Sequence, residues 1–323
     1  MPEALLAIDD VAAHFPVRRG FLRRAIGAVR AVDGVSLEIA PGETLGLVGE
    51  SGCGKSTLGR LVARLLRPTA GRITLGGRDI TGLSRRELRP VRRDVQIVFQ
   101  DPVAALNPRF TAGDIVGEPL VVHGIGDRRE RRARVAALFE QVGLRPDQID
   151  LHPHQFSGGQ RQRIGIARAL ALSPKLIVLD EPVSALDVSI QAQIVNLLMD
   201  VQQRTGVAYL FISHDLGVVE HVSRRIAVMY LGAIVELGEA RGLFDAPSHP
   251  YTQALLRSIP LADPAQRQAR RAVLPGELPS PLNPPSGCRF HTRCPEAVAR
   301  CRSETPMLKP VADGRHVACH LRE

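Results

Sequence analysis

The segment from Gly49 to Thr57 constrains the fold of this chain more than any other feature. It reads GESGCGKST and matches the pattern G-x-x-x-x-G-K-[ST]. The apolar run Thr44–Val48 precedes it, and residues 54–66 carry apolar side chains at helical spacing. A strand, a glycine turn and a helix in this order surround an anion with backbone N–H groups and a helix N-terminus. The sequence therefore predicts a phosphate-binding loop in an α/β fold, rather than a merely flexible glycine turn.

Residues of this loop are candidate ligands of a nucleotide. The Lys55 ammonium is expected to reach the β- and γ-phosphates, and the Ser56 hydroxyl is expected to ligate Mg²⁺. The other candidate contacts are Gly49, Ser51, Gly52, Cys53, Gly54 and Thr57. Two interpretations of the Cys53 thiol stay open. Either the helix N-terminus and Lys55 lower its pKa and make it reactive, or it is an inert side chain that fills the loop.

A second apolar run ends in two carboxylates. The run LIVL at residues 176–179 is followed by Asp180 and Glu181. A buried strand would deliver both to the edge where open α/β sheets bind ligands. The Asp180 carboxylate is expected to bind Mg²⁺, directly or through water, and Glu181 is a candidate general base for the attacking water. Alone, this pair would fit a surface turn better, but the loop at Gly49 favours the catalytic interpretation.

The rest of the chain divides by pattern. The runs YLFI at 209–212 and IAVMY at 226–230 are apolar on both faces, which is typical of parallel strands covered by helices. Shorter strand signals come earlier, at residues 5–9, 35–39 and 73–75, and helical periodicity dominates from residue 101 to 172. A stretch rich in Pro then reads as an extended connector. We expect a nucleotide-binding domain at 1–258 with a helical subdomain at about 101–172, a Pro-rich linker at 259–287, and a cysteine-bearing segment at 288–323.

Net charge and hydropathy limit the kinds of molecule that this chain is expected to bind. The formal net charge is +9, but aromatic residues make up only 4% of the chain and Trp is absent, so no basic run is interleaved with rings that stack bases. We therefore expect no nucleic-acid partner. No apolar run approaches the ~20 residues that span a bilayer. Residues 1–10 do not read as a secretory signal, so we expect the chain in the cytosol.

Further segments narrow the field of nucleotide hydrolases. They are FSGGQRQR at 156–163, QIVFQ ending at Gln100, SALD ending at Asp187, and FISHD containing His214. In this set the sequence resembles the ABC ATPase family, whose signature is LSGGQ, over residues 1 to about 250. Phe156 replaces the usual leucine. The resemblance implies a mixed sheet core, an antiparallel β subdomain and a helical signature subdomain, with a small C-terminal cysteine-rich extension.

The resemblance also implies roles for these residues. His214 would contact the γ-phosphate and hold Glu181 and water in line, and Gln100 would link the γ-phosphate and Mg²⁺ to transport. The contacts to a nucleotide bound by the opposite subunit would come from Ser157, Gly158, Gly159, Gln160 and Asp187. Phe15 is similar in position to the aromatic on which adenine stacks, with Phe21 as the alternative. A core aromatic is an equally good interpretation.

Several segments resemble one branch of this family, the ATPases of bacterial dipeptide and oligopeptide importers. They include GESGCGKSTLGRL, DEPVSALDVSIQAQ, HPYTQALL and the tail GELPSPLNPPSGCRFHTRCP. The match is closer to the second, F-type ATPase of the pair in those systems. It implies an ATP-hydrolysing subunit, peripheral on the cytoplasmic face of the inner membrane. Its implied partners are a sister ATPase in a heterodimer, two membrane permeases and, indirectly, an extracytoplasmic solute-binding protein. The transported solute stays open.

Two other ABC classes fit less well. ATPases for DNA repair or chromosome work insert a long coiled coil between the phosphate loop and the signature, and this chain has none. Translation-associated ABC proteins carry two nucleotide domains in one chain, whereas this chain has one set of motifs.

Four cysteines cluster near the C-terminus. They have spacings of x5, x6 and x17 and are Cys288, Cys294, Cys301 and Cys319. Spacing alone leaves zinc, iron–sulfur and unligated thiols open. The resemblance implies a [4Fe–4S] cluster held by the four thiolates, with zinc as the alternative. Nearby imidazoles that could support either site are His291, His316 and His320.

Overall fold

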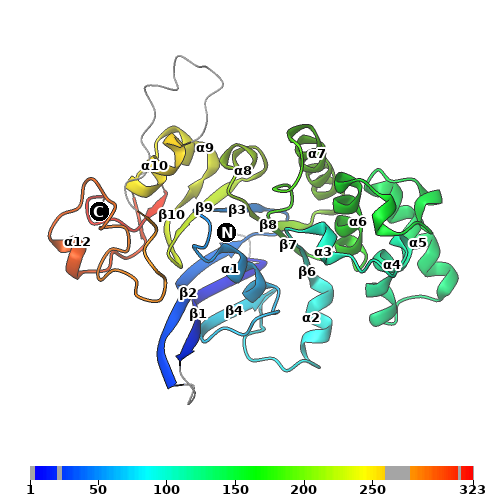
Figure 1. The fold of residues 1–323 in the computed structure, drawn as a ribbon, viewed down its shortest axis with the longest axis horizontal. Helices are drawn as coiled ribbons and strands as arrows, with labels where there is room; N and C mark the ends of the chain where they lie inside the picture. The colour runs from blue at the N-terminus through cyan, green and yellow to red at the C-terminus, as the bar shows by residue number, and fades with distance from the viewer. Residues whose placement is uncertain (1–3, 20–23, 259–276, 312–313, 323) are drawn as a thin grey trace.

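The computed structural model describes residues 4–19, 24–258, 277–311 and 314–322. They form two β-sheets with helices packed around them (Figure 1). The helices between residues 102 and 170 gather at one end of the larger sheet, and the C-terminal segment lies at the other end (Figure 1). Within the described residues, no helix has the length and apolar character needed to cross a bilayer.

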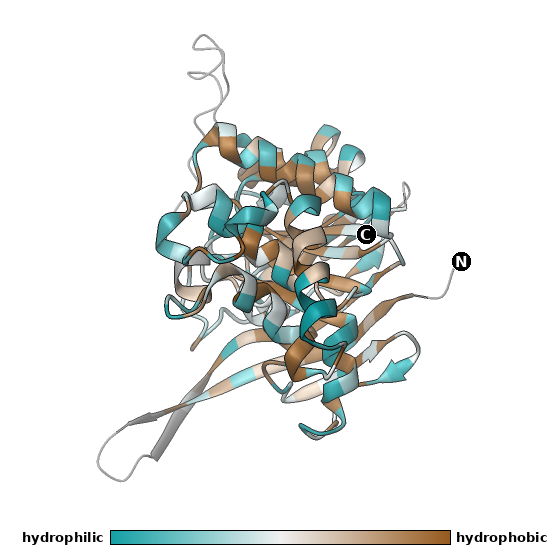
Figure 2. Cartoon of the chain, turned by 90° about the vertical axis from the view of Figure 1, so that its right-hand side faces the viewer, coloured by the Kyte–Doolittle hydropathy of each residue, from teal (hydrophilic) through white to brown (hydrophobic). Residues whose placement is uncertain are grey.

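The smaller sheet is antiparallel and is built mainly from the N-terminal strands. Its order is β2-β1-β4-β5, with β1 Leu6–Arg19, β2 Arg24–Ile39, β4 Ala70–Leu75 and β5 Arg78–Asp79. Leu6 lies opposite Ile39, and both are buried in one cluster with Leu58 of α1 (Lys55–Val62). β1 and β2 extend beyond this cluster as a two-stranded ribbon (Figure 2). The sequence predicted only the apolar parts of these strands, at residues 5–9 and 35–39.

The larger sheet is mixed and carries the predicted parallel strands. Five neighbouring strands are parallel: β9 Arg225–Tyr230, β3 Thr44–Val48, β8 Ala208–Ile212, β7 Leu176–Asp180 and β6 Val95–Val98. Every residue of β3, β7 and β8 is buried, as runs that are apolar on both faces require. Beyond β9 the sheet continues antiparallel through β10 Ala233–Glu239, β12 His316–Val317 and β11 Lys309–Pro310.

Helices cover this sheet, and one glycine sets how closely α1 approaches it. A Cβ on Gly59 would lie 2.8 Å from Ile212 and 2.9 Å from Val178, so α1 can seat here only with glycine at this position. The other helices outside the helical end of the sheet are α2 Leu88–Asp94, α7 Val188–Thr205, α8 Leu216–Val222, α9 Ala240–Asp245 and α10 Pro250–Arg257.

The helical end confirms the periodicity read from the sequence. It contains α3 Pro102–Ala105, α4 Ala112–Val122, α5 Arg128–Gln141, α6 Gly158–Leu170 and two short 3₁₀ turns, Pro146–Gln148 and Pro153–Gln155. Thr111 and Asp127 close capping boxes at the starts of α4 and α5. Val135 and Leu138 are buried, whereas the arginine-rich start of α5 faces solvent.

The C-terminal segment is joined to the core rather than appended to it. β12 pairs with β10 through Glu236 opposite Val317, and one further helix, α12 (Arg300–Ser303), follows the turn at Phe290. Phe290 is 1% exposed and belongs to the main hydrophobic cluster. Of the predicted Pro-rich linker, residues 259–276 lie outside the described residues, and the predicted domain boundaries stay predictions.

Candidate nucleotide-binding site

An open pocket of about 450 Å³ lies where four parallel strands end. The loops after β3, β6, β7 and β8 all reach it, as expected for ligand sites in open α/β sheets. It is lined by Ala31, Ser51, Gly52, Gly54, Lys55, Ser56, Thr57, Gln100, Glu181 and His214. Nine of these residues were predicted site residues; Ala31 was not, because a lone alanine in a strand carries no sequence signal.

The phosphate loop wraps around the Lys55 side chain. Lys55 Nζ donates to the backbone oxygens of Gly49 at 2.7 Å and Glu50 at 3.0 Å. Gly54 has φ of 111°, and a Cβ there would lie 2.0 Å from the backbone oxygen of Ala31. The loop therefore needs glycine at this position to pass close to β2.

The Ser56 hydroxyl and the Asp180 carboxylate meet at one side of the pocket. Ser56 Oγ donates to Asp180 Oδ1 at 2.7 Å. Burial raises the pKa of Asp180, and the hydrogen bond from Ser56 partly opposes this shift. A buried carboxylate beside a hydroxyl is a set of hard oxygen ligands that suits Mg²⁺.

The Glu181 carboxylate is held by two side chains from neighbouring strand ends. Gln100 Nε2 donates to Glu181 Oε2 at 2.8 Å, and His214 Nδ1 lies 3.2 Å from the same oxygen. The backbone of Glu181 has φ of 50°, a left-handed conformation that is rare outside glycine and asparagine. Such strain is typical of functional sites, where surrounding contacts hold the residue in place.

The signature residues lie outside this pocket. Ser157 caps α6: its Oγ accepts from Gln160 N at 3.3 Å, and Gln160 Oε1 accepts from Ser157 N at 2.9 Å. A Cβ on Gly159 would lie 2.6 Å from Ile190, so the start of α6 packs against the start of α7. Asp187 is the N-cap residue of α7, and both Asp187 and Ser157 are exposed.

Phe15, Gly49, Cys53 and Asp180 are predicted contacts that are not among the residues lining the pocket, although Asp180 accepts from Ser56 there. Phe15 lies on β1, is 42% exposed, and is not among the residues that line the pocket. Phe21 lies outside the described residues.

Cys53 is 1% exposed, and burial raises the pKa of its thiol despite the nearby Lys55 ammonium. Of the two open interpretations of Cys53, its burial therefore favours an inert side chain that fills the loop over a reactive, low-pKa thiol.

Residues of the C-terminal part also contact the phosphate loop, which sequence reasoning missed. Arg293 forms two hydrogen bonds to the Glu50 carboxylate, at 2.7 and 3.0 Å. Tyr251 Oη accepts from the Glu50 backbone N–H at 2.9 Å. Tyr251 belongs to the segment HPYTQALL, which the sequence singled out without indicating this contact.

The four C-terminal cysteines lie near one another without forming a coordination site. Burial, and secondarily the charges of the other three thiolates, raise the pKa of Cys288 to about 11. Among the described residues, no three His, Cys, Asp or Glu side chains are grouped so that they could hold a metal ion. Within the part of the chain that the structure describes, there is therefore no preformed site for a [4Fe–4S] cluster or for zinc.

The fold and the pocket define a P-loop ATPase: a phosphate loop and the two consecutive carboxylates of Asp180 and Glu181 meet at the ends of parallel strands. The sequence model of the ABC transporter family matches residues 32–184, and that of the oligopeptide/dipeptide transporter C-terminal region matches residues 235–301. The chain belongs to the ABC transporter family of ATP-binding proteins and is an ABC-type ATPase. This confirms the predicted family, and ATP and Mg²⁺ are consistent with it.

Similar proteins support this assignment over the whole chain. The "Probable peptide ABC transporter ATP-binding protein y4tS" of Sinorhizobium fredii is 56% identical over 322 residues, covering 100% of this chain and 91% of that protein. The oligopeptide transport ATP-binding protein AppF of Bacillus subtilis is 55% identical, covering 99% and 98%. One similar solved structure is the ATP-binding cassette MJ0796, as a dimer in a post-hydrolysis state bound to ADP and Pi. It matches this chain with a TM-score of 0.65 and 30% sequence identity, and the match covers 73% of this chain and 99% of that chain. The MJ0796 structure confirms the predicted fold class.

Proposed function

We propose that this chain is the ATP-hydrolysing subunit of an ABC importer that takes up di- and oligopeptides or similar small solutes. The observation that carries the proposal is the Glu181 carboxylate, held by Gln100 and His214 at the phosphate-loop pocket. The peptide-transport names of the relatives and the match to the oligopeptide/dipeptide C-terminal region support the solute class.

The pocket would bind MgATP through three kinds of contact. Backbone groups of Gly52 and Gly54 surround the phosphates, and Lys55 turns from its backbone acceptors to the β- and γ-phosphates. Ser56 and Asp180 are the residues that would hold Mg²⁺, with Gln100 beside them. Mg²⁺ neutralises phosphate charge that develops during transfer.

Hydrolysis would follow from the arrangement around Glu181. Its carboxylate would accept a proton from the attacking water, whose oxygen bonds to the γ-phosphorus. The bond from that phosphorus to the β,γ-bridging oxygen then breaks, which releases ADP and inorganic phosphate. Gln100 and His214 keep Oε2 of this carboxylate oriented. His214 also donates toward the γ-phosphate.

A second ATPase would complete each site. Ser157, Gly158, Gly159 and Gln160 begin α6 away from this chain's own pocket, and the first two are exposed. Free N–H groups at a helix start bind anions. We infer that these residues and Asp187 contact ATP bound by the partner ATPase, a sister chain in a heterodimer. The dimeric form of the similar cassette MJ0796 supports such pairing.

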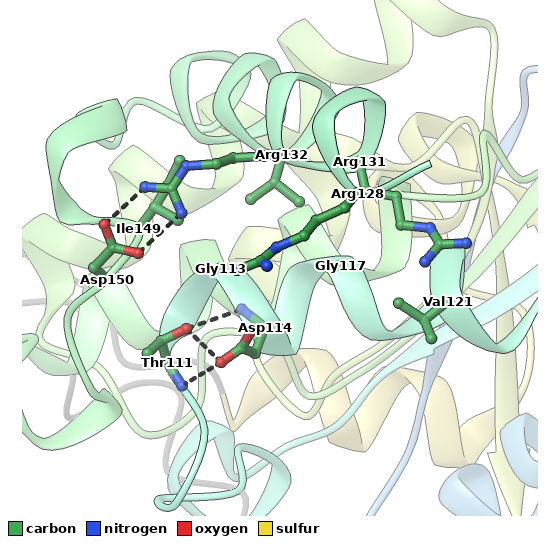
Figure 3. Close-up of a pocket in the computed structure, with 11 residues that line it drawn as sticks. Thr111, Gly113, Asp114, Gly117, Val121, Arg128, Arg131, Arg132, Ile149 and Asp150 are labelled. Atoms are coloured by element: carbon green, nitrogen blue, oxygen red, sulfur yellow. Dashed lines mark hydrogen bonds and ion pairs between the residues drawn. The ribbon is translucent and has the colours of Figure 1, made fainter. Parts of the chain in front are cut away.

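The helical end would contact the permeases. A second pocket, of about 230 Å³, opens between α4 and α5 (Figure 3). Arg128 and Arg131 lie on its α5 side, while Arg132 points to Asp150 and pairs with it at 2.8 Å (Figure 3). Val121, which is 58% exposed, lies at one edge. We infer that two membrane permeases dock on this end and on residues 100–109, which places the chain peripherally on the cytoplasmic face of the inner membrane.

Reconstitution tests the proposal. The chain, its sister ATPase, the two permeases and the solute-binding protein are placed in lipid vesicles with defined di- and oligopeptides. We expect peptide-dependent ATP hydrolysis and peptide uptake. Stimulation by free amino acids or metal ions in place of peptides would contradict the proposed solute class, and the absence of ATP hydrolysis would contradict the proposed function itself.

Iron–sulfur ligation by the C-terminal cysteines is a separate proposal. The presence of all four cysteines in one C-terminal segment supports it, and Cys288 N donates to the Cys301 backbone oxygen there at 2.8 Å. Anaerobic purification should then give a brown protein with about four irons per chain. A colourless protein with one zinc would identify a zinc site, and a metal-free protein would refute both.

A further inference from the structure

The phosphate loop is held from outside by the C-terminal segment. Glu50 directly follows Gly49, and both of its carboxylate oxygens accept from the Arg293 guanidinium, at 2.7 and 3.0 Å. The Arg293 side chain is 5% exposed, although 243 positions separate the two residues along the chain. A buried, bidentate arginine–carboxylate pair fixes the positions of both partners more firmly than a surface pair.

The backbone of Glu50 is held as well. Its N–H donates to Tyr251 Oη at 2.9 Å, and its carbonyl oxygen accepts from Lys55 Nζ at 3.0 Å. Tyr251 is fully buried and packs against Tyr230 and Phe290, with ring centroids 4.7 and 5.4 Å away. Glu50 therefore connects a rigid aromatic cluster to the lysine of the phosphate loop.

A short segment fixes Tyr251 in turn. His249 Nδ1 accepts from Tyr251 N at 3.0 Å, and His249 N donates to Glu236 Oε2 at 2.9 Å. Pro250 starts α10, where its missing N–H costs nothing. The sequence His249-Pro250-Tyr251 thus ties the start of α10 to β10 and directs the Tyr251 hydroxyl at the phosphate loop.

We propose that Arg293 and Tyr251 are positioning residues that hold the phosphate loop in its ATP-binding shape. The inference rests on the proposed role of the loop in ATP binding. Arg293 also neutralises the negative charge of Glu50. Without its arginine, the Glu50 carboxylate would repel the phosphates of ATP. The C-terminal segment is thereby part of the support of the nucleotide site, and changes in it alter ATP affinity.

Calorimetric titration of the purified full-length chain with MgATP tests this. Arg293→Met should raise Kd about tenfold, in line with coupling between linked sites. Arg293→Lys, which keeps the charge but not the bidentate pair, should raise it less. Adding Glu50→Gln to Arg293→Met should restore part of the affinity, because the repelling charge is gone. A merely structural role for Arg293 would not produce this recovery.

A matched control is Arg289→Met. Arg289 lies in the same segment but pairs with Asp33 of β2, at 2.6 Å, rather than with a residue of the phosphate loop. The Arg289→Met variant should leave the Kd for MgATP unchanged. An equal rise in Kd for Arg289→Met, or an unchanged Kd for Arg293→Met, would overturn the inference. If Arg293→Met does not fold, Tyr251→Phe removes one oxygen from an otherwise unchanged ring and should raise Kd about threefold; no rise would likewise overturn it.

A further variant separates this inference from the proposed function. Lys55→Ala should abolish measurable MgATP binding. Loss of binding in Lys55→Ala together with normal binding in Arg293→Met and Tyr251→Phe would refute only the positioning role. Normal binding in Lys55→Ala would refute the proposed use of the loop as the ATP site.

Discussion

His214 Nδ1 lies 3.2 Å from Glu181 Oε2, and the two residues follow neighbouring parallel strands, β8 and β7. The pairing of Asp180 with Ile212 in the sheet sets the strand ends side by side. The Glu181 N–H also donates to the Ile212 oxygen at 2.9 Å, which continues the ladder by one residue. The sheet itself therefore brings the proposed base and the imidazole together before any nucleotide binds.

Gln100→Ala should uncouple hydrolysis from transport. Gln100 reaches the Glu181 carboxylate from just beyond the end of β6, and it begins the segment 100–109 that is proposed to contact the permeases. We expect normal MgATP affinity but a fall of about 10- to 100-fold in peptide-stimulated ATP hydrolysis, since a group that orients the base is lost. The measurement is ATPase activity of the reconstituted importer with and without peptide. Gln96→Ala, on the same strand but bonded to the Arg92 backbone, is the control; unchanged stimulation in Gln100→Ala would contradict the proposed coupling.

Cys53 should resist alkylation in the folded chain. Its side chain is buried and its thiol pKa is raised, so the reactive thiolate is scarce and shielded. Brief treatment with iodoacetamide and peptide mapping should show labelling of Cys294 and Cys319, which are partly exposed, before Cys53. Labelling of Cys53 should require unfolding and should not depend on ATP. Rapid labelling of Cys53 that MgATP prevents would instead support a reactive thiol.

His249 should make the chain less stable at acidic pH. Burial, and secondarily the Arg322 charge, lower the pKa of His249 to about 3, while Glu236 accepts from its backbone N–H. Between pH ~6.5 and ~3 the unfolded chain binds a proton that the folded chain does not, so the free energy of unfolding falls by up to about 1.4 kcal/mol per pH unit as pH decreases.

Urea denaturation at about pH 7 and about pH 5 measures this effect. His249→Gln should lose stability at both values but show a smaller difference between them. His221→Gln, at an exposed position on α8, is the control and should keep the original difference. A His249→Gln variant with the full pH dependence would assign the effect to other groups.

The features predicted well from the sequence are local ones. The run LIVL at 176–179 and the loop after Val48 carry their information in a few adjacent residues, because a buried strand and a glycine turn each have a short pattern. The Glu50–Arg293 pair has no such pattern, since its partners lie 243 positions apart in the sequence. The sequence left two interpretations of Cys53 open because neighbours in sequence indicate charge but not burial.

The outer parts of β1 and β2 show a different limit. Paired residues such as His14 and Arg30 are polar and partly exposed, so neither face of the ribbon has the alternation that identifies a strand. His14 Nε2 instead contacts Asp33 at 2.8 Å across the ribbon. Cross-strand pairs of this kind are visible only in three dimensions.

The most direct test of the account is the turnover of Glu181→Gln compared with its MgATP binding. The change removes the proposed base and keeps the side-chain shape, so kcat should fall by about 10²–10⁴. MgATP at about 100 times Kd should still stabilise the variant by about 2.7 kcal/mol in thermal unfolding, and Lys55→Ala should lose that stabilisation. Near-normal ATP turnover by Glu181→Gln would contradict the assignment of Glu181 as the base.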